Sequence, residues 1–224
     1  MTRLGREDSS FAFLAKRQGV SSDLALGDRR ARAAALLVAA LPGSLYIYQG
    51  DELGLDEVTD IPAERIEDPM YHRSGGTDPG RDGCRVPLPW SGDEPPFGFS
   101  PEIATDDPWL PQPAAWAALT VEAQAADPDS MLSLYRSMLA IRRAEPDLRG
   151  SDLRWLHTTS DVLAFRRGAR FVCLTNVSAR PVSLPAGASP LLASAPLVDG
   201  WLPVDATAWV RIPATSDSMG GGRG

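Results

Sequence analysis

Two short polar motifs contain the residues that could contact a substrate. The first is Tyr-Gln-Gly-Asp-Glu-Leu-Gly at 48–54, a glycine-flanked acidic turn that directly follows an apolar run. At the carboxyl end of a parallel strand in an α/β barrel, carboxylates face the active site and can accept hydrogen bonds from substrate hydroxyls. Asp51 and Glu52 are therefore candidate substrate-binding residues. The alternative is an ordinary solvated turn.

The second motif is Arg-Asp-Gly-Cys-Arg-Val-Pro-Leu-Pro-Trp at 81–90. Its prolines can hold Arg85 near Trp90, so that a forked donor lies beside an apolar platform. Such a donor suits sugar hydroxyls or a carboxylate. The alternative is that Arg85 only pairs with Asp82 or Glu94 on a surface loop.

Helix and strand signals precede the first motif. Asp28 can cap a helix over 28–41, which is rich in alanine and leucine and is stopped by Pro42 and the glycine after it. Residues 45–49 begin with an aromatic and β-branched run without polar alternation, which predicts a strand buried on both faces. A helix followed by a buried strand indicates a parallel α/β unit.

A long loop and a second helix follow. Residues 60–114 are irregular and rich in proline and glycine, and they form most of a loop expected at about 56–128. Loops of this length are usually functional or disordered, and the aromatic residues here argue against disorder. Apolar residues recur at helical spacing over 130–145, which predicts a helix that ends at Pro146.

From residue 151 the apolar period becomes that of strands. The candidate strands lie at 152–156, 162–166, 171–175, 182–184 and 209–212. Short strands separated by glycine, proline, serine and asparagine predict an antiparallel β-sandwich. The polar tail at 214–224 is expected not to pack.

Composition excludes several classes of function. The chain has 29 acidic and 22 basic side chains and a formal charge of −7, without a basic stripe, so we expect no nucleic-acid partner. The longest apolar run, 31–41, is too short to span a membrane, and the first residues do not resemble a signal peptide. Cys84 and Cys173 match no zinc spacing, which predicts no metal site and fits a reducing cytoplasm.

The two motifs together carry a resemblance to a known family. Leu-Pro-Gly-Ser at 41–44, the acidic turn at 48–54 and Arg-Val-Pro-Leu-Pro-Trp at 85–90 resemble the α-glucosidase and oligo-1,6-glucosidase branch of the α-amylase superfamily, glycoside hydrolase family 13. The resemblance implies an α/β plus all-β fold. In that fold 1–148 form the last part of a (β/α)8 TIM barrel and 149–213 form a C-terminal antiparallel β-sandwich.

The resemblance also implies roles for individual residues. Arg85 is similar to the arginine that lines the glucose site in this branch, and Glu52 is similar to the acid near the leaving-group site. Asp51 occupies a position that is often an acid or an amide. Tyr48 and Trp90 are expected to pack against the barrel mouth.

No catalytic residue is expected in the chain. Retaining hydrolysis by this family needs an aspartate nucleophile, a glutamate acid/base and a third aspartate. The first two belong to earlier strands. The third lies in an Asn-His-Asp motif that is typically followed by Val-Thr-Arg, and this chain begins Met-Thr-Arg. His72 and His157 are not followed by aspartate, so neither supplies that motif.

The expected function is that of a fragment of a retaining α-glucosidase, which hydrolyses terminal α-linked glucose from short oligosaccharides. No cofactor is implied, and the isolated chain is expected to be inactive. One alternative is a transglycosylating relative of the trehalose synthase or sucrose isomerase type. Another is a non-catalytic carbohydrate-contact module or a truncated gene product.

Overall fold

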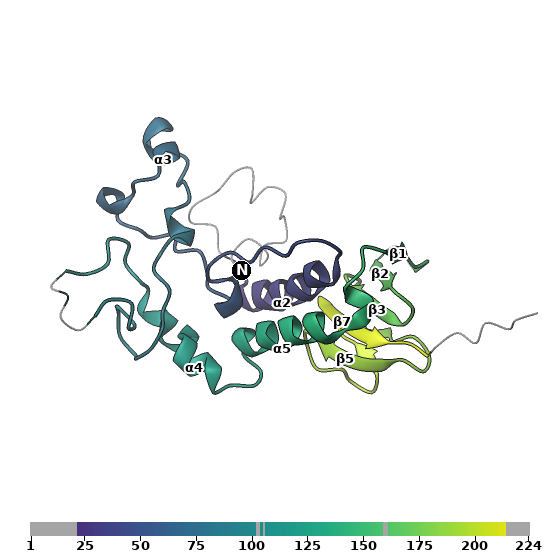
Figure 1. Cartoon of the computed structure of the whole chain (residues 1–224). Coiled ribbons are helices and arrows are strands. Elements are labelled where there is room, and N and C mark those ends of the chain that lie inside the picture. The colour runs from purple at the N-terminus through teal and green to yellow at the C-terminus, as the bar shows by residue number, and fades with distance from the viewer. Residues whose placement is uncertain (1–21, 102–103, 105, 159–160, 214–224) are drawn as a thin grey trace, which may run out of the picture. The chain divides into compact units, whose positions relative to one another are not determined.

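The computed structural model describes residues 22–101, 104, 106–158 and 161–213 (Figure 1). The chain forms two compact units. The first contains Met1–Ala35 and Leu45–Ser137, and the second contains Leu36–Ser44 and Met138–Gly224. Two helices, α2 (Leu24–Ala40) and α5 (Met131–Ala144), each contribute residues to both units. The Met-Thr-Arg sequence at 1–3 and the tail at 214–224 lie outside the described residues.

The start of α2 differs from the expected one. Asp23, and not Asp28, caps the helix, because its Oδ1 accepts a hydrogen bond from the backbone N–H of Leu26 at 2.9 Å. The helix ends at Ala40, just before Pro42, as the sequence predicts. The glycine before Asp28 did not stop the helix from extending toward the N-terminus by one more turn.

The buried strand predicted at 45–49 is wrong. No strand forms there, and the side chain of Tyr46 is 90% exposed. A parallel strand needs a neighbouring strand to take up its backbone hydrogen bonds. Among the described residues, none lies alongside this segment in a sheet.

The first unit is built mainly from short helical turns connected by loops, which agrees with the long irregular segment predicted from the sequence. After the first motif come η2 (Ala63–Arg65), α3 (Pro69–Arg73), η3 (Asp82–Cys84), η4 (Ala114–Leu119) and α4 (Val121–Ala125). Val58, Val86, Phe97 and Trp116 pack into a buried cluster. This cluster holds the loop around both motifs, so the loop has an apolar core of its own.

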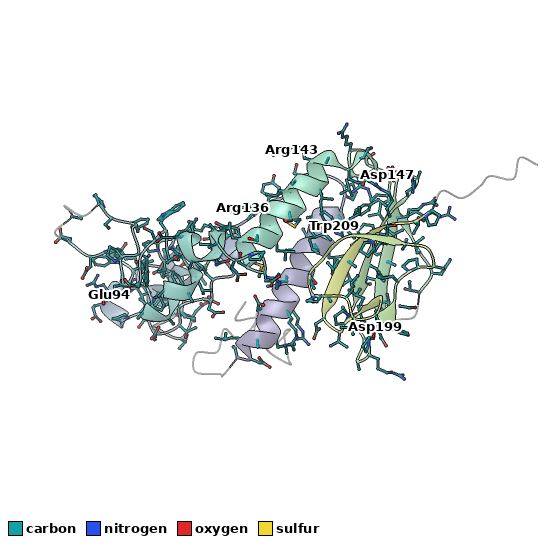
Figure 2. The ribbon with its side chains drawn as sticks, turned by 90° about the horizontal axis from the view of Figure 1, so that it is seen from below. Glu94, Arg136, Arg143, Asp147, Asp199 and Trp209 are labelled. Atoms are coloured by element: carbon teal, nitrogen blue, oxygen red, sulfur yellow. The ribbon has the colours of Figure 1, made fainter. Side chains whose placement is uncertain are left out.

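The helix predicted at 130–145 is present as α5. Its residues Met131, Leu134 and Met138 are buried at helical spacing. Arg142 and Arg143 lie in the last turn, where their charge favours the negative end of the helix dipole. Figure 2 labels Arg143 near the C-terminal end of this helix.

The second unit contains the antiparallel strands predicted after residue 151. A five-stranded sheet has the order β1-β2-β3-β7-β5, and β4 pairs with β6 in a separate two-stranded sheet. The strands are β1 (Arg154–Trp155), β2 (Val162–Arg167), β3 (Phe171–Asn176), β4 (Val182–Ser183), β5 (Ser189–Ala193), β6 (Trp201–Leu202) and β7 (Ala206–Arg211). Strands β5 and β6 were not predicted.

Both faces of the larger sheet are covered. On one face Val172 and Val210 belong to an apolar cluster that also includes Leu202 of β6. On the opposite face Phe171 and Trp209 are fully buried and meet edge to face, with ring centroids 5.5 Å apart. The indole Nε1 of Trp209 donates to the carbonyl oxygen of residue 36 in α2 at 3.0 Å (Figure 2). This contact places the C-terminal end of α2 against the sheet.

Candidate functional site

A cleft of about 580 Å³ lies in the first unit and brings the two motifs together. Its walls come from the acidic turn, the segment just after it, the second motif and one buried tryptophan. The lining residues are Tyr48, Gln49, Gly50, Asp51, Leu55, Asp56, Glu57, Arg81, Gly83, Cys84, Arg85, Val86 and Trp116. The cleft therefore presents three carboxylates and two guanidinium groups to a ligand.

The acidic turn is closed by its own side chains. Gly50 has a φ of 90°, a conformation that is unfavourable for residues other than glycine. Asp51 Oδ2 accepts the backbone N–H of Tyr48 at 3.0 Å, and Glu52 Oε2 accepts the N–H of Gly50 at 3.0 Å. Asp51 lines the cleft, but Glu52 is not among the lining residues. The structure therefore brings Asp51 and Arg85 into one cleft and uses the Glu52 carboxylate within the turn.

A buried glutamine side chain holds this turn in place through hydrogen bonds. Gln124 of α4 donates from Nε2 to the carbonyl oxygen of Leu53 at 2.9 Å, and its Oε1 accepts the backbone N–H of Leu132 at 3.0 Å. Both groups are buried, so breaking these hydrogen bonds would leave polar atoms unsatisfied. The position of Asp51 is thus tied to α4 and to the first turn of α5.

The second motif depends on a close approach between two backbone segments. Val58 donates its N–H to the carbonyl oxygen of Gly83 at 2.9 Å. A Cβ added at Gly83 would lie only 2.2 Å from the carbonyl oxygen of Val58, which no side chain could tolerate. Glycine at position 83 therefore allows the second motif to lie against the segment that follows the acidic turn.

Arg85 lines the cleft and is also part of an ion-pair cluster. Its Nη1 lies 3.0 Å from Oδ2 of Asp68 and 3.0 Å from Oδ1 of Asp82. The pairing with Asp82 is the simpler alternative weighed from the sequence, and Glu94 does not take part. The Arg85 side chain stays 46% exposed, so pairing does not remove it from the cleft.

Burial shifts the protonation of groups around the cleft. Desolvation raises the pKa of the Asp56 carboxyl, whose Oδ1 is buried and has no hydrogen-bond partner among the residues that the structure describes. Burial first, and then the charges of Asp51 and Glu52, raise the pKa of Tyr135 to about 12. Burial, followed by the neighbouring Cys84, also raises the pKa of Tyr48. These shifts indicate that the surface around the cleft is partly desolvated and acidic.

Several residues of the site escaped sequence reasoning. Asp68 has the signal of a helix cap, because Pro69 follows it, but nothing in the sequence links it to Arg85. Asp56 and Glu57 carry no flanking motif. Trp116 belongs to the loop core and lines the cleft only through folding.

The described residues contain neither a metal-binding cluster nor a membrane-spanning helix. In the described ranges no three His, Cys, Asp or Glu side chains gather in a way that could hold a metal ion. None of the helices described by the structure is both long and apolar enough to cross a bilayer.

The comparisons with known proteins agree with the two motifs. The family model described as "Alpha amylase, catalytic domain" matches residues 17–150. A probable alpha-glucosidase of Rhizobium meliloti (strain 1021) is 36% identical over 154 residues, which cover 67% of this chain and 27% of that protein. A glucan 1,6-alpha-glucosidase of Streptococcus pneumoniae is 30% identical over 176 residues, covering 67% of this chain and 31% of that protein. The chain thus spans less than a third of the length of these relatives.

Solved structures give the same picture. The crystal structure of the alpha-glucosyl transfer enzyme XgtA has a TM-score of 0.68 and 35% identity, covering 82% of this chain and 35% of that one. The trehalulose synthase MutB from Pseudomonas mesoacidophila MX-45 has a TM-score of 0.65 at 24% identity, covering 82% of this chain and 38% of that one. The second likeness concerns the fold alone.

Proposed function

The chain belongs to the family of α-amylase catalytic domains, and we propose that it is the C-terminal part of a retaining α-glucosidase. The whole protein would release terminal α-linked glucose from short oligosaccharides. Two curated relatives, named as a probable alpha-glucosidase and a glucan 1,6-alpha-glucosidase, support this substrate class.

One observation carries the proposal: Asp51 and Arg85, from motifs more than 30 residues apart, line the same cleft. A guanidinium and a carboxylate in one cleft offer donors and acceptors to the many hydroxyls of a pyranose ring. Trp116 adds an apolar surface for the carbon face of the ring. In this proposal the Glu52 carboxylate stabilises the turn through its hydrogen bond to Gly50, and the Asp51 carboxylate contacts the substrate.

In this proposal residues 1–148 complete a (β/α)8 barrel and 149–213 form a β-sandwich. The two-stranded sheet of β4 and β6 would be the second layer of the sandwich, since Val182 and Leu202 pack toward the larger sheet.

Catalysis would depend on carboxylates outside this chain. A nucleophile and an acid/base about 5 Å apart are needed for retention, and a third aspartate supports them. The 224 residues would bind and orient the sugar and would not hydrolyse it alone. The two free thiols, Cys84 and Cys173, fit a cytoplasmic location.

A transglycosylating activity is the second candidate, and the likeness to an alpha-glucosyl transfer enzyme at 35% identity favours it. The test uses the chain extended upstream in its own reading frame and supplied with maltose. Hydrolysis predicts glucose as the main product, first released as the α-anomer. Accumulation of longer or rearranged disaccharides would favour transfer, and inactivity toward every α-glucoside would contradict both candidates.

A further inference from the structure

In the part of the chain that the structure describes, only one of the three guanidinium nitrogens of Arg85 makes hydrogen bonds. Nη1 donates to Asp68 Oδ2 and to Asp82 Oδ1, each at 3.0 Å, which uses both of its N–H groups. Within the described residues Nε and Nη2 make no hydrogen bond. Three N–H donors of this side chain are therefore left for a ligand.

The two carboxylates are fixed by backbone groups. Asp82 Oδ2 accepts the N–H groups of Glu67 at 2.7 Å and of Asp68 at 2.9 Å. Asp68 accepts the N–H groups of Met70 at 2.9 Å and of Arg81 at 3.0 Å. The two aspartate side chains are only 5% and 7% exposed, whereas Arg85 is 46% exposed. The carboxylates therefore determine where the arginine lies, and not the reverse.

The geometry of guanidinium then sets what the arginine can bind. The group is planar, so two fixed acceptors on Nη1 restrict the orientation of the plane. The opposite edge, formed by Nε and Nη2, carries two nearly parallel N–H groups that suit two adjacent oxygen atoms. Adjacent hydroxyls of a pyranose present such a pair.

The charge of the cluster decides between neutral and anionic ligands. Two carboxylates and one guanidinium leave one negative charge in this cluster. The other charged side chains that line the cleft are three carboxylates, Asp51, Asp56 and Glu57, and one guanidinium, Arg81, so the acidic groups still outnumber the basic ones. A carboxylate or phosphate on the ligand would be repelled at short range, where screening is incomplete. Neutral hydroxyl groups are not repelled by these charges.

Resting on the proposed function, we propose that Asp68 and Asp82 are positioning residues for Arg85. They hold Nη1 so that the Nε–Nη2 edge faces adjacent hydroxyls of a neutral sugar, and their charge makes the cleft reject anionic sugars. Neither aspartate touches the substrate itself.

The first test measures the reactivity of Arg85 in the 224-residue chain. Phenylglyoxal modifies guanidinium nitrogens, and peptide mapping reports the rate at each arginine. In Asp82→Asn the amide oxygen can still accept the N–H groups of residues 67 and 68, but the amide nitrogen no longer accepts from Arg85. We expect Arg85 to react roughly fivefold faster in this variant, since a charge-assisted hydrogen bond is lost.

We call the pairing of Arg85 with Asp68 and Asp82 the clamp. Two controls separate loss of the clamp from general unfolding. Asp93→Asn removes one charge from an exposed position of the same loop, and it should leave the Arg85 rate unchanged. Arg154 in β1 is exposed and provides an internal reference in every digest. An unchanged Arg85 rate in Asp82→Asn, or equal acceleration at Arg154, would overturn the clamp.

The second test uses maltose as the protecting ligand. We expect maltose to slow modification of Arg85 in the natural sequence, and to need roughly fivefold higher concentration in Asp82→Asn. Glucose 1-phosphate and glucuronate should protect less than maltose. Better protection by either anion would overturn the charge argument, and equal maltose dependence in both chains would overturn the positioning role.

The outcomes distinguish this inference from the proposed function. If maltose protects Arg85 in neither chain while Asp82→Asn still accelerates modification, the clamp exists but serves no sugar. The proposed carbohydrate contact would then be wrong. If maltose protects both chains equally, the carbohydrate contact stands and the positioning role is wrong.

Discussion

The Nη1 atom of Arg167 lies 2.7 Å from the carbonyl oxygen of Ala40, which is 127 residues earlier in the chain. Arg167 is fully buried in β2, and burial lowers the pKa of its guanidinium. It also donates to the carbonyl oxygens of Asp152, Leu148 and Gly150. The C-terminus of α2 thus receives its cap from an arginine of β2, as the helix dipole favours.

Removing this guanidinium should destabilise the second unit. We expect Arg167→Met to lower its free energy of unfolding by about 3 kcal/mol, because four carbonyl groups, two of them in buried hydrogen bonds, would lose a donor. Urea unfolding followed by tryptophan fluorescence, to which the buried Trp209 contributes, measures the change. Arg166→Met is the matched control on the same strand, and a change of similar size there would contradict the capping role.

The acid sensitivity of the first unit should depend on Asp68. The N–H of Met70, and then those of Arg81 and the Arg85 guanidinium, lower the pKa of this carboxyl despite its burial. Because the folded pKa is depressed, the stabilisation is complete above the ordinary value of about 4 and is lost as pH falls through the folded pKa. Asp68→Asn should be less stable at neutral pH and should lose less stability in acid. Urea midpoints across this range give the comparison, and parallel curves for the two chains would be evidence against it.

Tyr135 should be the last tyrosine to ionise. Its pKa of about 12 reflects burial first and the nearby charges of Asp51 and Glu52 second. A raised folded pKa contributes stability that is present below the ordinary value of about 10 and is lost as pH rises through 12. The phenolate absorbance should therefore contain a late step that disappears in Tyr135→Phe. Asp51→Asn should move this step to lower pH, and an unmoved step would place Tyr135 away from the acidic turn.

The two thiols should differ in reactivity. Cys173 is fully buried in β3, and burial raises its pKa, whereas Cys84 lines the cleft. A disulfide reagent should titrate one thiol in the native chain and two after denaturation. Cys84→Ser should abolish the native signal. Two reactive thiols in the folded chain would contradict the burial of β3.

Local periodicity predicted much of this fold. The helix α5 and the strands β2 and β3 follow from the spacing and density of their apolar residues, most of which are buried in the structure. The segment 45–49 was predicted incorrectly because a parallel strand depends on neighbours that local sequence cannot supply. Strand β5 includes Ser189 and Pro190, and it forms through pairing with β7.

The site was only partly predictable for the same reason. Asp51 and Arg85 stand in recognisable motifs, and the structure brings them to one cleft. The contact between Arg85 and Asp68 joins residues 17 positions apart, and the loop between them shows no helical or strand periodicity in its sequence. Likewise, an arginine in the sequence of β2 suggests an exposed side chain, and its burial follows from carbonyl groups supplied by distant segments.

Hydrolysis of an aryl α-glucoside, measured in parallel for the 224-residue chain and for the chain extended upstream, tests the central claim most directly. We predict no turnover above background by the 224 residues, because the proposed function assigns both carboxylates required for retention to a part of the protein outside this chain. The extended chain should turn over, and Arg85→Ala should reduce its kcat/KM roughly tenfold or more. Turnover by the 224-residue chain that survives both Arg85→Ala and Glu52→Gln would contradict the account, since it would require a catalytic site other than the cleft described above.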